Sequence, residues 1–156
     1  MNEPTLAEIR ARQDKWDRFY LAMAEYVSSA SKDPSTKTGA VIVRPDLTVA
    51  SMGFNGFARN MNDAPELYAN RDEKYSRIIH AEINAIVNSH GPVDGCTMYV
   101  TLAPCDRCAV VIAQSGIKRV VAYATPPALA ERWEGLLSRA SGYFEEAGIE
   151  LKILDR

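Results

Sequence analysis

The sequence predicts a single α/β domain in which helices cover both faces of a mixed five-stranded sheet. The chain has 156 residues, a length that is typical of one domain. Hydrophobic residues make up 47% and charged residues 24% of the chain, as in ordinary globular proteins. Short apolar, β-branched runs alternate with segments of helical periodicity. The first two of these runs are consecutive, which favours a hairpin followed by β-α-β units.

The first expected helix begins at a capping box formed by Thr5 and Glu8. It continues with an apolar stripe at helical spacing, which comprises Trp16, Phe19, Tyr20, Met23 and Val27. The helix is expected to end before Asp33-Pro34, because a residue that precedes proline avoids helical backbone angles.

A hairpin is expected over residues 40–43 and 49–54, which flank a Pro-Asp turn. Residues 55–77 are rich in Asn, Asp, Gly and Arg, and we expect them to form a long functional loop. Residues 78–88 have helical character and are followed by a His-Gly-Pro sequence that ends the helix.

The rest of the chain alternates between strands and helices. The expected strands cover residues 96–101, 119–124 and 150–154, and the expected helices cover residues 105–115 and 128–147. A glycine follows each of these helices at the position of a C-terminal cap.

Charge and sorting signals restrict the classes of partner. Eighteen Lys and Arg against twenty Asp and Glu give a net charge of -2, which does not favour a polynucleotide partner. The N-terminus does not resemble a signal peptide, and apolar runs such as residues 109–113 are too short to cross a bilayer. We therefore expect a cytoplasmic protein with no membrane partner. In that reducing compartment, paired cysteines bind metal or act in catalysis more often than they form disulfides.

Two short motifs predict a metal site. His80 and Glu82 lie at the start of one expected helix, and Cys105 and Cys108 lie at the start of another. Zinc takes thiolates and imidazole nitrogen, and three protein ligands leave one coordination position open, as in catalytic zinc sites. Such a zinc lowers the pKa of a bound water to about 7. Glu82 is not needed as a ligand and is free to move protons between water and a substrate.

Two other interpretations of these motifs are weaker. A redox C-x-x-C would leave His80 and Glu82 unexplained, and a non-catalytic zinc scaffold has no use for a free acid beside the metal. The order H-x-E followed by P-C-x-x-C is the order found in zinc deaminases that act on nucleobases.

Four segments together resemble the deoxycytidylate (dCMP) deaminase branch of the zinc-dependent cytidine deaminase superfamily. They are residues 31–43, 53–56, 80–86 and 101–108. The resemblance covers about Trp16 to Leu154 and implies a three-layer α-β-α cytidine-deaminase-like fold. It implies one deaminase domain over residues 1–156, with a zinc core at about 16–154 and an N-terminal helical extension at 1–15.

The resemblance implies zinc-dependent hydrolysis of dCMP to dUMP and ammonia, in pyrimidine deoxynucleotide metabolism. It implies one catalytic zinc ion per chain, held by His80, Cys105 and Cys108, with Glu82 as the proton shuttle. The backbone of Ala81 would contact O2 of the base, and the carbonyl of Ala103 would contact the amine. Asn55 resembles the residue that holds the sugar. Residues 55–79 contain no Cys and no His, so we do not expect a second structural zinc there.

Recognition of the phosphate rests on weaker signals. A hairpin brings the start of its first strand beside the end of its second, so Lys37 is expected to reach the same mouth as Asn55 and to bind phosphate there. Tyr123, at the end of a strand, is expected to close over the sugar or phosphate. The residues alone leave a cytidine or deoxycytidine nucleoside deaminase open as an alternative.

We also expect a homo-oligomer, either a dimer or a hexamer, since such assemblies are common among the relatives that the resemblance implies. The apolar positions expected to contribute to a subunit interface follow the zinc cysteines, and they are Ala109, Val110, Ile112 and Ala113.

Overall fold

The computed structural model describes residues 3–156 and contains one central five-stranded sheet with the strand order β2-β1-β5-β6-β7. Its strands are β1 (Gly39–Val43), β2 (Val49–Phe54), β5 (Thr97–Val100), β6 (Arg119–Tyr123) and β7 (Glu150–Leu154). β1 pairs antiparallel with β2 and with β5, whereas β5, β6 and β7 run parallel to one another. The prediction of a mixed sheet that begins with a hairpin is confirmed.

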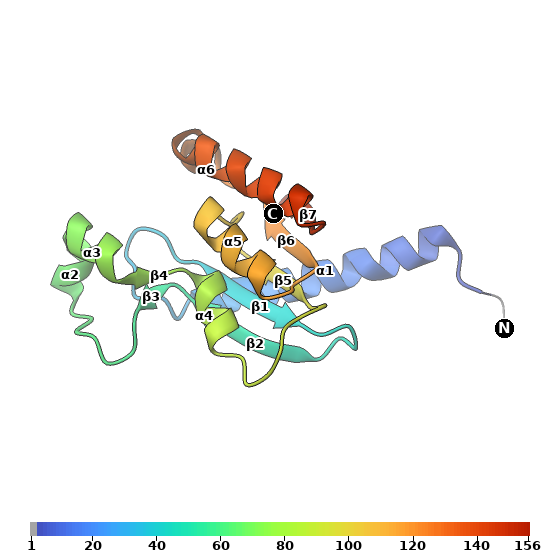
Figure 1. Cartoon of the computed structure of the whole chain (residues 1–156), viewed down its shortest axis with the longest axis horizontal. Helices are drawn as coiled ribbons and strands as arrows, with labels where there is room; N and C mark the ends of the chain where they lie inside the picture. The colour runs from blue at the N-terminus through green and yellow to red at the C-terminus, as the bar shows by residue number, and fades with distance from the viewer. Residues whose placement is uncertain (1–2) are drawn as a thin grey trace.

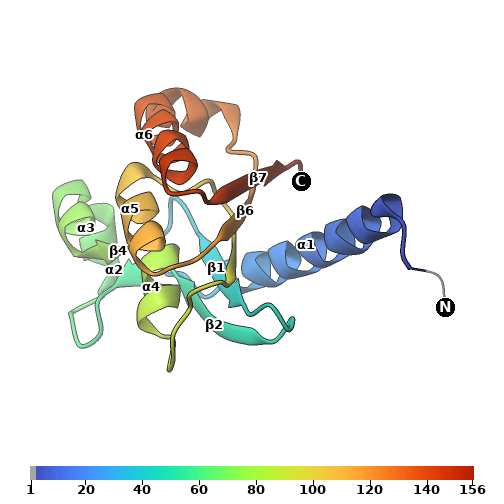
Figure 2. The ribbon, with the colours of Figure 1, turned by 45° about the vertical axis from the view of Figure 1, so that its right-hand side comes forward.

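Helices cover both faces of this sheet (Figures 1 and 2). α1 (Leu6–Ser28) lies on one face, and α4 (Ala81–Val87), α5 (Asp106–Gln114) and α6 (Pro127–Glu146) lie on the other. Each face has its own core of buried apolar side chains. The expected three-layer α-β-α architecture is therefore confirmed. Within residues 3–156, no helix is both long and apolar enough to cross a membrane.

The capping box at the start of α1 forms as expected, since the Thr5 side chain accepts from the Glu8 amide and Glu8 accepts from the Thr5 backbone. Tyr20, Leu21 and Ala24 bury one face of the helix against the sheet. Residues 6–15 are exposed, and this part of α1 projects beyond the sheet (Figure 1).

A buried carboxylate attaches α1 to the far strands of the sheet. Asp17 is fully buried and accepts two hydrogen bonds from the guanidinium of Arg119 on β6, at 2.7 and 2.8 Å. Lys152 on β7 donates at 2.8 Å, and the Tyr99 hydroxyl donates at 3.0 Å. Burial alone would raise the pKa of Asp17, but the hydrogen bonds from Arg119, Lys152 and Gln13 outweigh it and hold that pKa well below its ordinary value.

The segment 55–77, expected as a loop, contains regular structure. It holds β3 (Gly56–Phe57), α2 (Pro65–Ala69) and α3 (Arg71–Arg77), and β3 pairs with β4 (Ile78–Ile79). These elements are short, and their stability comes from local caps and tertiary contacts that polar composition does not reveal. The pairing of β4 also explains why the helix expected from residue 78 begins only at Ala81.

Two contacts illustrate how this segment is held. The rings of Phe57 and Tyr68 stack with their centroids 4.0 Å apart. At the junction between α2 and α3, the side chain of Asn70 accepts hydrogen bonds from the amides of Asp72 and Glu73. The segment is therefore an ordered wall beside the sheet.

Candidate functional site

The N-termini of α4 and α5 meet on one face of the sheet and bring the two predicted motifs together. His80 is the residue that precedes α4, Cys105 is the residue that precedes α5, and Cys108 lies in the first turn of α5. Gly53 on β2 allows α4 to pack closely, because a Cβ there would lie 2.8 Å from the carbonyl oxygen of Ala81. The packing of α4 on the hairpin thus positions the turn that carries His80 and Glu82.

Three donor atoms form a compact group. Nδ1 of His80 lies 3.6 Å from Sγ of Cys105 and 3.3 Å from Sγ of Cys108, and all three lie within 4.8 Å of one another. Ligands at ordinary zinc–sulfur and zinc–nitrogen bond lengths would be separated by about 3.6 Å in a tetrahedron. The donor set therefore fits a tetrahedral metal with three protein ligands and one open position.

The three donors change one another's pKa. The hydrogen bond with Cys108 lowers the pKa of Cys105 to about 4, although burial opposes the shift, and His80 contributes to the lowering. The hydrogen bond with Cys105 raises the pKa of His80 to about 8 against the effect of burial. The same thiolate and burial raise the pKa of the Cys108 thiol. The three donors must be deprotonated to bind a metal, so binding displaces the protons that they carry.

Glu82 stands beside these donors in the first turn of α4. Its side chain is only 4% exposed, and burial raises the pKa of its carboxyl while the nearby His80 opposes that shift. It is not one of the three grouped donors. A buried carboxyl whose pKa is raised suits a general acid–base, which must both accept and donate a proton.

A cavity of about 830 Å³ opens over these residues. His80, Glu82 and Cys105 line it, together with Ala81 and Ala103. Its remaining walls come from the segment before β1, from α3 and from α6. Five basic side chains line it, which are Arg71, Lys74, Arg107, Arg132 and Arg139. Its volume falls in the ordinary range for small-molecule sites.

Asn55 also lines the cavity, and it is 6% exposed. Its side-chain oxygen accepts from the Thr38 amide at 2.8 Å, and its side-chain nitrogen donates to the Thr36 carbonyl at 2.8 Å. The amide of Asn55 therefore holds the segment before β1 in shape at the edge of the cavity.

A buried ion pair at the cavity was not predicted from the sequence. Asp33 is 1% exposed, and its carboxylate accepts from Nζ of Lys74 at 2.8 Å and from the Ser35 amide at 2.8 Å. This pair connects α3 to the segment before β1. The sequence could have predicted the turn at Asp33, since Asp before Pro-Ser is typical of a side-chain-capped turn. It could not have predicted the pairing with Lys74, which lies 41 residues away.

The structure does not bring Lys37 or Tyr123 to the cavity. Lys37 is exposed, and the neighbours that line the cavity are Thr36 and Thr38. Tyr123 packs in the core beneath α1, with the guanidinium of Arg156 5.0 Å from its ring centroid. Side chains alternate along a strand, so Tyr123 shares the α1 face with Val121, whereas the cavity lies on the opposite face.

The apolar positions of α5 mostly serve the core of their own chain. Ala109 and Ile112 are fully buried in the core under α4, α5 and α6, and Ala113 packs against that core. Val110 is 54% exposed. Of these four positions, Val110 alone presents a largely exposed side chain to a partner subunit.

Replacing Cys105 or Cys108 by Ser is expected to remove metal and activity together, since each sulfur is one of only three grouped donors. Zinc content per chain after gel filtration and turnover on the same sample measure both effects. Cys96→Ser is the matched control, because Cys96 is buried outside the donor group and its variant should keep the metal. Full zinc occupancy in both the Cys105 and the Cys108 variants would refute this ligand set.

Comparison with known proteins identifies the family of this chain. A family model described as the cytidine and deoxycytidylate deaminase zinc-binding region matches residues 14–124. A protein of Aliivibrio fischeri described as an uncharacterized deaminase in the luxG 3′ region is 37% identical over 137 residues, which are 88% of this chain and 92% of that protein. Deoxycytidylate deaminase of Mus musculus is 39% identical over 115 residues, which are 69% of this chain.

The chain matches only 64% of the length of the mouse protein. Among solved structures, dCMP deaminase from the cyanophage S-TIM5 in complex with dCMP and dUMP superposes with a TM-score of 0.73. That match covers 90% of this chain and 97% of the phage chain at 24% identity, so it establishes the shared fold. From the site and the family match together, this chain belongs to the cytidine and deoxycytidylate deaminase zinc-binding family.

Proposed function

We propose that this protein hydrolyses dCMP to dUMP and ammonia in pyrimidine deoxynucleotide metabolism, with one catalytic zinc ion per chain. The observation that carries the proposal is the group of His80, Cys105 and Cys108 beside the buried carboxyl of Glu82, at a cavity of nucleotide size. Relatives that are 37–39% identical are named deoxycytidylate deaminases, and this supports dCMP as the substrate.

In this proposal, His80, Cys105 and Cys108 hold the zinc. When bound, zinc supplies a water molecule of lowered pKa as the nucleophile. Water adds at C4 of the cytosine ring, and the bond from C4 to the exocyclic nitrogen then breaks. Glu82 takes one proton from the water and passes it to N3. It then takes the second proton from the hydroxyl now on C4 and passes it to the departing amine, so that the C4 carbonyl forms and ammonia leaves. The Ala81 backbone is proposed to contact O2 of the base, and the Ala103 carbonyl to accept from the amine.

The charge of the cavity favours a nucleotide over a nucleoside. Lys74 is paired with Asp33, and Arg139 is paired with Asp106. Arg71, Arg107 and Arg132 have no ion-pair partner within the described residues 3–156. A phosphate group is a suitable partner for such arginines, because charge-assisted hydrogen bonds are the stronger kind.

We expect the wild-type enzyme to prefer dCMP clearly over deoxycytidine. Each charge-assisted contact contributes about 1.5–3 kcal/mol, so one contact made only by the nucleotide raises kcat/KM roughly 10–150-fold. Ammonia release from dCMP, CMP, dCTP, deoxycytidine and cytidine measures the preference. A higher kcat/KM for deoxycytidine would favour the nucleoside deaminase alternative, and no turnover of any of the five would favour a non-catalytic zinc scaffold.

The environment and assembly of the enzyme are further parts of the proposal. We propose a cytoplasmic enzyme whose partner is a small nucleotide, with neither a polynucleotide nor a membrane as a partner. We also propose a dimer or hexamer on the basis of the family. Its interface is not assigned to α5, because most of the apolar positions there are buried within the chain.

A further inference from the structure

One wall of the cavity comes from a part of the chain that the family match does not cover. The match ends at residue 124, and α6 begins at Pro127. Four side chains of α6 nevertheless line the cavity, and they are Arg132, Trp133, Leu136 and Arg139. Their spacing places them on one face of the helix. A feature of this chain outside the shared zinc-binding region therefore faces the substrate space.

The position of this face is fixed relative to the metal-binding residues. Ala140 and Phe144 anchor the second half of α6 in the same core as α4 and α5. The guanidinium of Arg139 donates to the carboxylate of Asp106 at 2.9 Å through Nε, and its Nη2 lies 2.9 Å from the same oxygen. Asp106 is the residue that directly follows the ligand Cys105. The helix is thus held against the turn that carries both cysteines.

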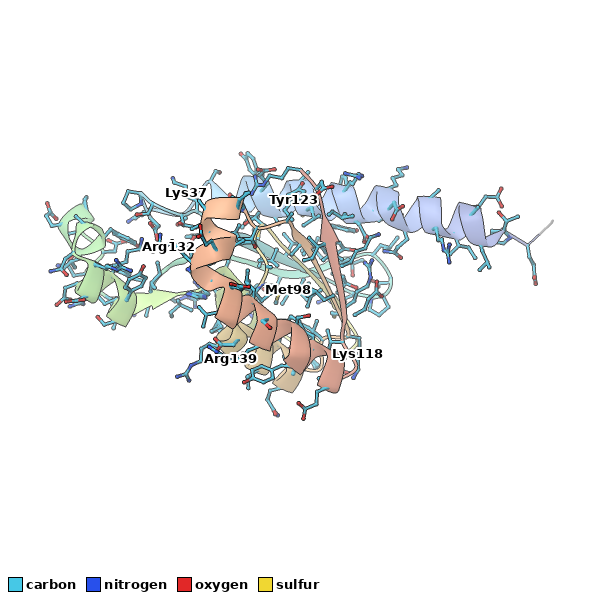
Figure 3. The ribbon with its side chains drawn as sticks, turned by 90° about the horizontal axis from the view of Figure 1, so that it is seen from above. Lys37, Met98, Lys118, Tyr123, Arg132 and Arg139 are labelled. Carbon is cyan, nitrogen blue, oxygen red and sulfur yellow. The ribbon has the colours of Figure 1, made fainter. Side chains whose placement is uncertain are left out.

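The two arginines of this face differ in charge environment. Arg139 is neutralised by Asp106. Arg132 forms no ion pair within the described residues 3–156, and it is exposed while lining the cavity. In Figure 3, both arginines lie on the side of α6 that faces α3. Arg132 therefore offers a free guanidinium to an anion in the cavity, and the half-buried Trp133 offers an aromatic surface beside it.

Along α6, Arg132 lies away from the metal-binding residues, where the phosphate end of a bound nucleotide would be. Arg132 and Arg139 are seven residues apart, which is ~10 Å along a helix. Arg139 is at the metal end, because it contacts Asp106. The reacting C4 of a cytosine must lie near Glu82 and the metal ligands, and the 5′-phosphate lies at the opposite end of the nucleotide. The other two cavity arginines that form no ion pair within residues 3–156 are placed differently from Arg132. Arg107 lies between the two cysteines, at the metal end, and Arg71 lies over the ring of Tyr75 on α3.

We propose that α6 is a specificity element of this enzyme, in which Arg132 binds the 5′-phosphate and Trp133 packs against the nucleoside. This inference rests on the proposed function and assigns the phosphate to a residue outside the family match. It also differs from the sequence-based expectation, which gave the phosphate to Lys37.

The test compares nucleotide with nucleoside in Arg132→Gln. Its kcat/KM for dCMP is expected to fall roughly 10–150-fold, mainly through KM, while that for deoxycytidine stays within about twofold. Competition by dUMP and by deoxyuridine gives the same comparison without relying on slow nucleoside turnover, with dUMP alone weakened. Trp133→Leu should weaken dUMP and deoxyuridine by similar factors. Arg132→Lys, which keeps the charge, should recover part of the loss.

Arg139→Gln is the matched control on the same helix face, and it should show no selective loss of dUMP over deoxyuridine. Equal effects of Arg132→Gln on both ligands, or no effect on either, would overturn the inference. A selective loss of dUMP in Lys37→Gln, Arg71→Gln or Arg107→Gln with Arg132→Gln unaffected would overturn it as well. Failure of the proposed function would give a different result from failure of this inference. The wild-type enzyme would then not deaminate dCMP at all, or it would prefer deoxycytidine.

Discussion

Replacing Glu82 by Gln is expected to lower kcat for dCMP by roughly 1,000-fold, while the protein keeps its fold and one zinc per chain. General acid–base groups contribute about 10²–10⁴-fold to turnover, and an amide can neither accept the proton of the water nor deliver it to the amine. Glu82 is not one of the three grouped donors, so its loss should leave the metal in place. Steady-state ammonia release and zinc content on the same sample measure the two effects.

The control is Glu131→Gln, which changes an exposed glutamate on α6 and should leave turnover unchanged. A Glu82→Gln enzyme with near wild-type turnover would assign proton transfer to another group. Loss of zinc together with turnover would show instead that Glu82 is needed to hold the metal.

Replacing Asp17 by Asn is expected to lower the free energy of unfolding by about 3–5 kcal/mol. Removing one partner of a buried ion pair leaves the other charge buried and uncompensated. Here the charge left behind is the guanidinium of Arg119, whose side chain is 14% exposed, together with Lys152. Urea unfolding of the zinc-loaded protein, followed by circular dichroism, measures the change.

Asp14→Asn is the matched control, since Asp14 also pairs with Lys152 but is 58% exposed, and exposed pairs contribute little. It should cost less than about 1 kcal/mol. A similar loss in both variants would show that the Asp17 cluster has no special role in holding α1 to β6 and β7.

Acidification should weaken the wild-type protein through the same carboxylate. The pKa of Asp17 is lowered in the folded state, so its contribution is fully present above its unfolded pKa of about 3.9. That contribution is lost as the pH falls below this value, because the unfolded state takes up the proton more readily. Unfolding free energies between pH 6 and pH 3 should therefore fall more steeply for wild type than for Asp17→Asn.

The sequence was sufficient for the elements that are set by local patterns. The strand 150–154 matches β7, and the helix expected at 105–115 matches α5 within one residue at each end. The glycine that follows α5 adopts the expected left-handed conformation, with φ of 82° at Gly116. The grouping of His80, Cys105 and Cys108 could also be predicted, because these residues lie in short motifs at helix starts.

The rest depends on contacts between distant parts of the chain. The pairs Phe57–Tyr68 and Asp33–Lys74 order the segment that polar composition suggested was a loop. The face of the sheet on which Tyr123 lies follows from strand register, which a single apolar run does not reveal. The four α6 side chains at the cavity lie on a helix whose amphipathic pattern predicts only that one side is buried. Their role depends on where α6 packs.

Zinc K-edge X-ray absorption of the purified, active enzyme measures the ligands of the metal. We expect two sulfur ligands at about 2.3 Å, one imidazole nitrogen at about 2.0–2.1 Å and one further light-atom ligand from solvent or substrate. Addition of dUMP should change the shell of light atoms and leave the two sulfurs unaltered. A closed shell of four protein ligands that dUMP does not affect would contradict the assignment of His80, Cys105 and Cys108 as an open, catalytic zinc site.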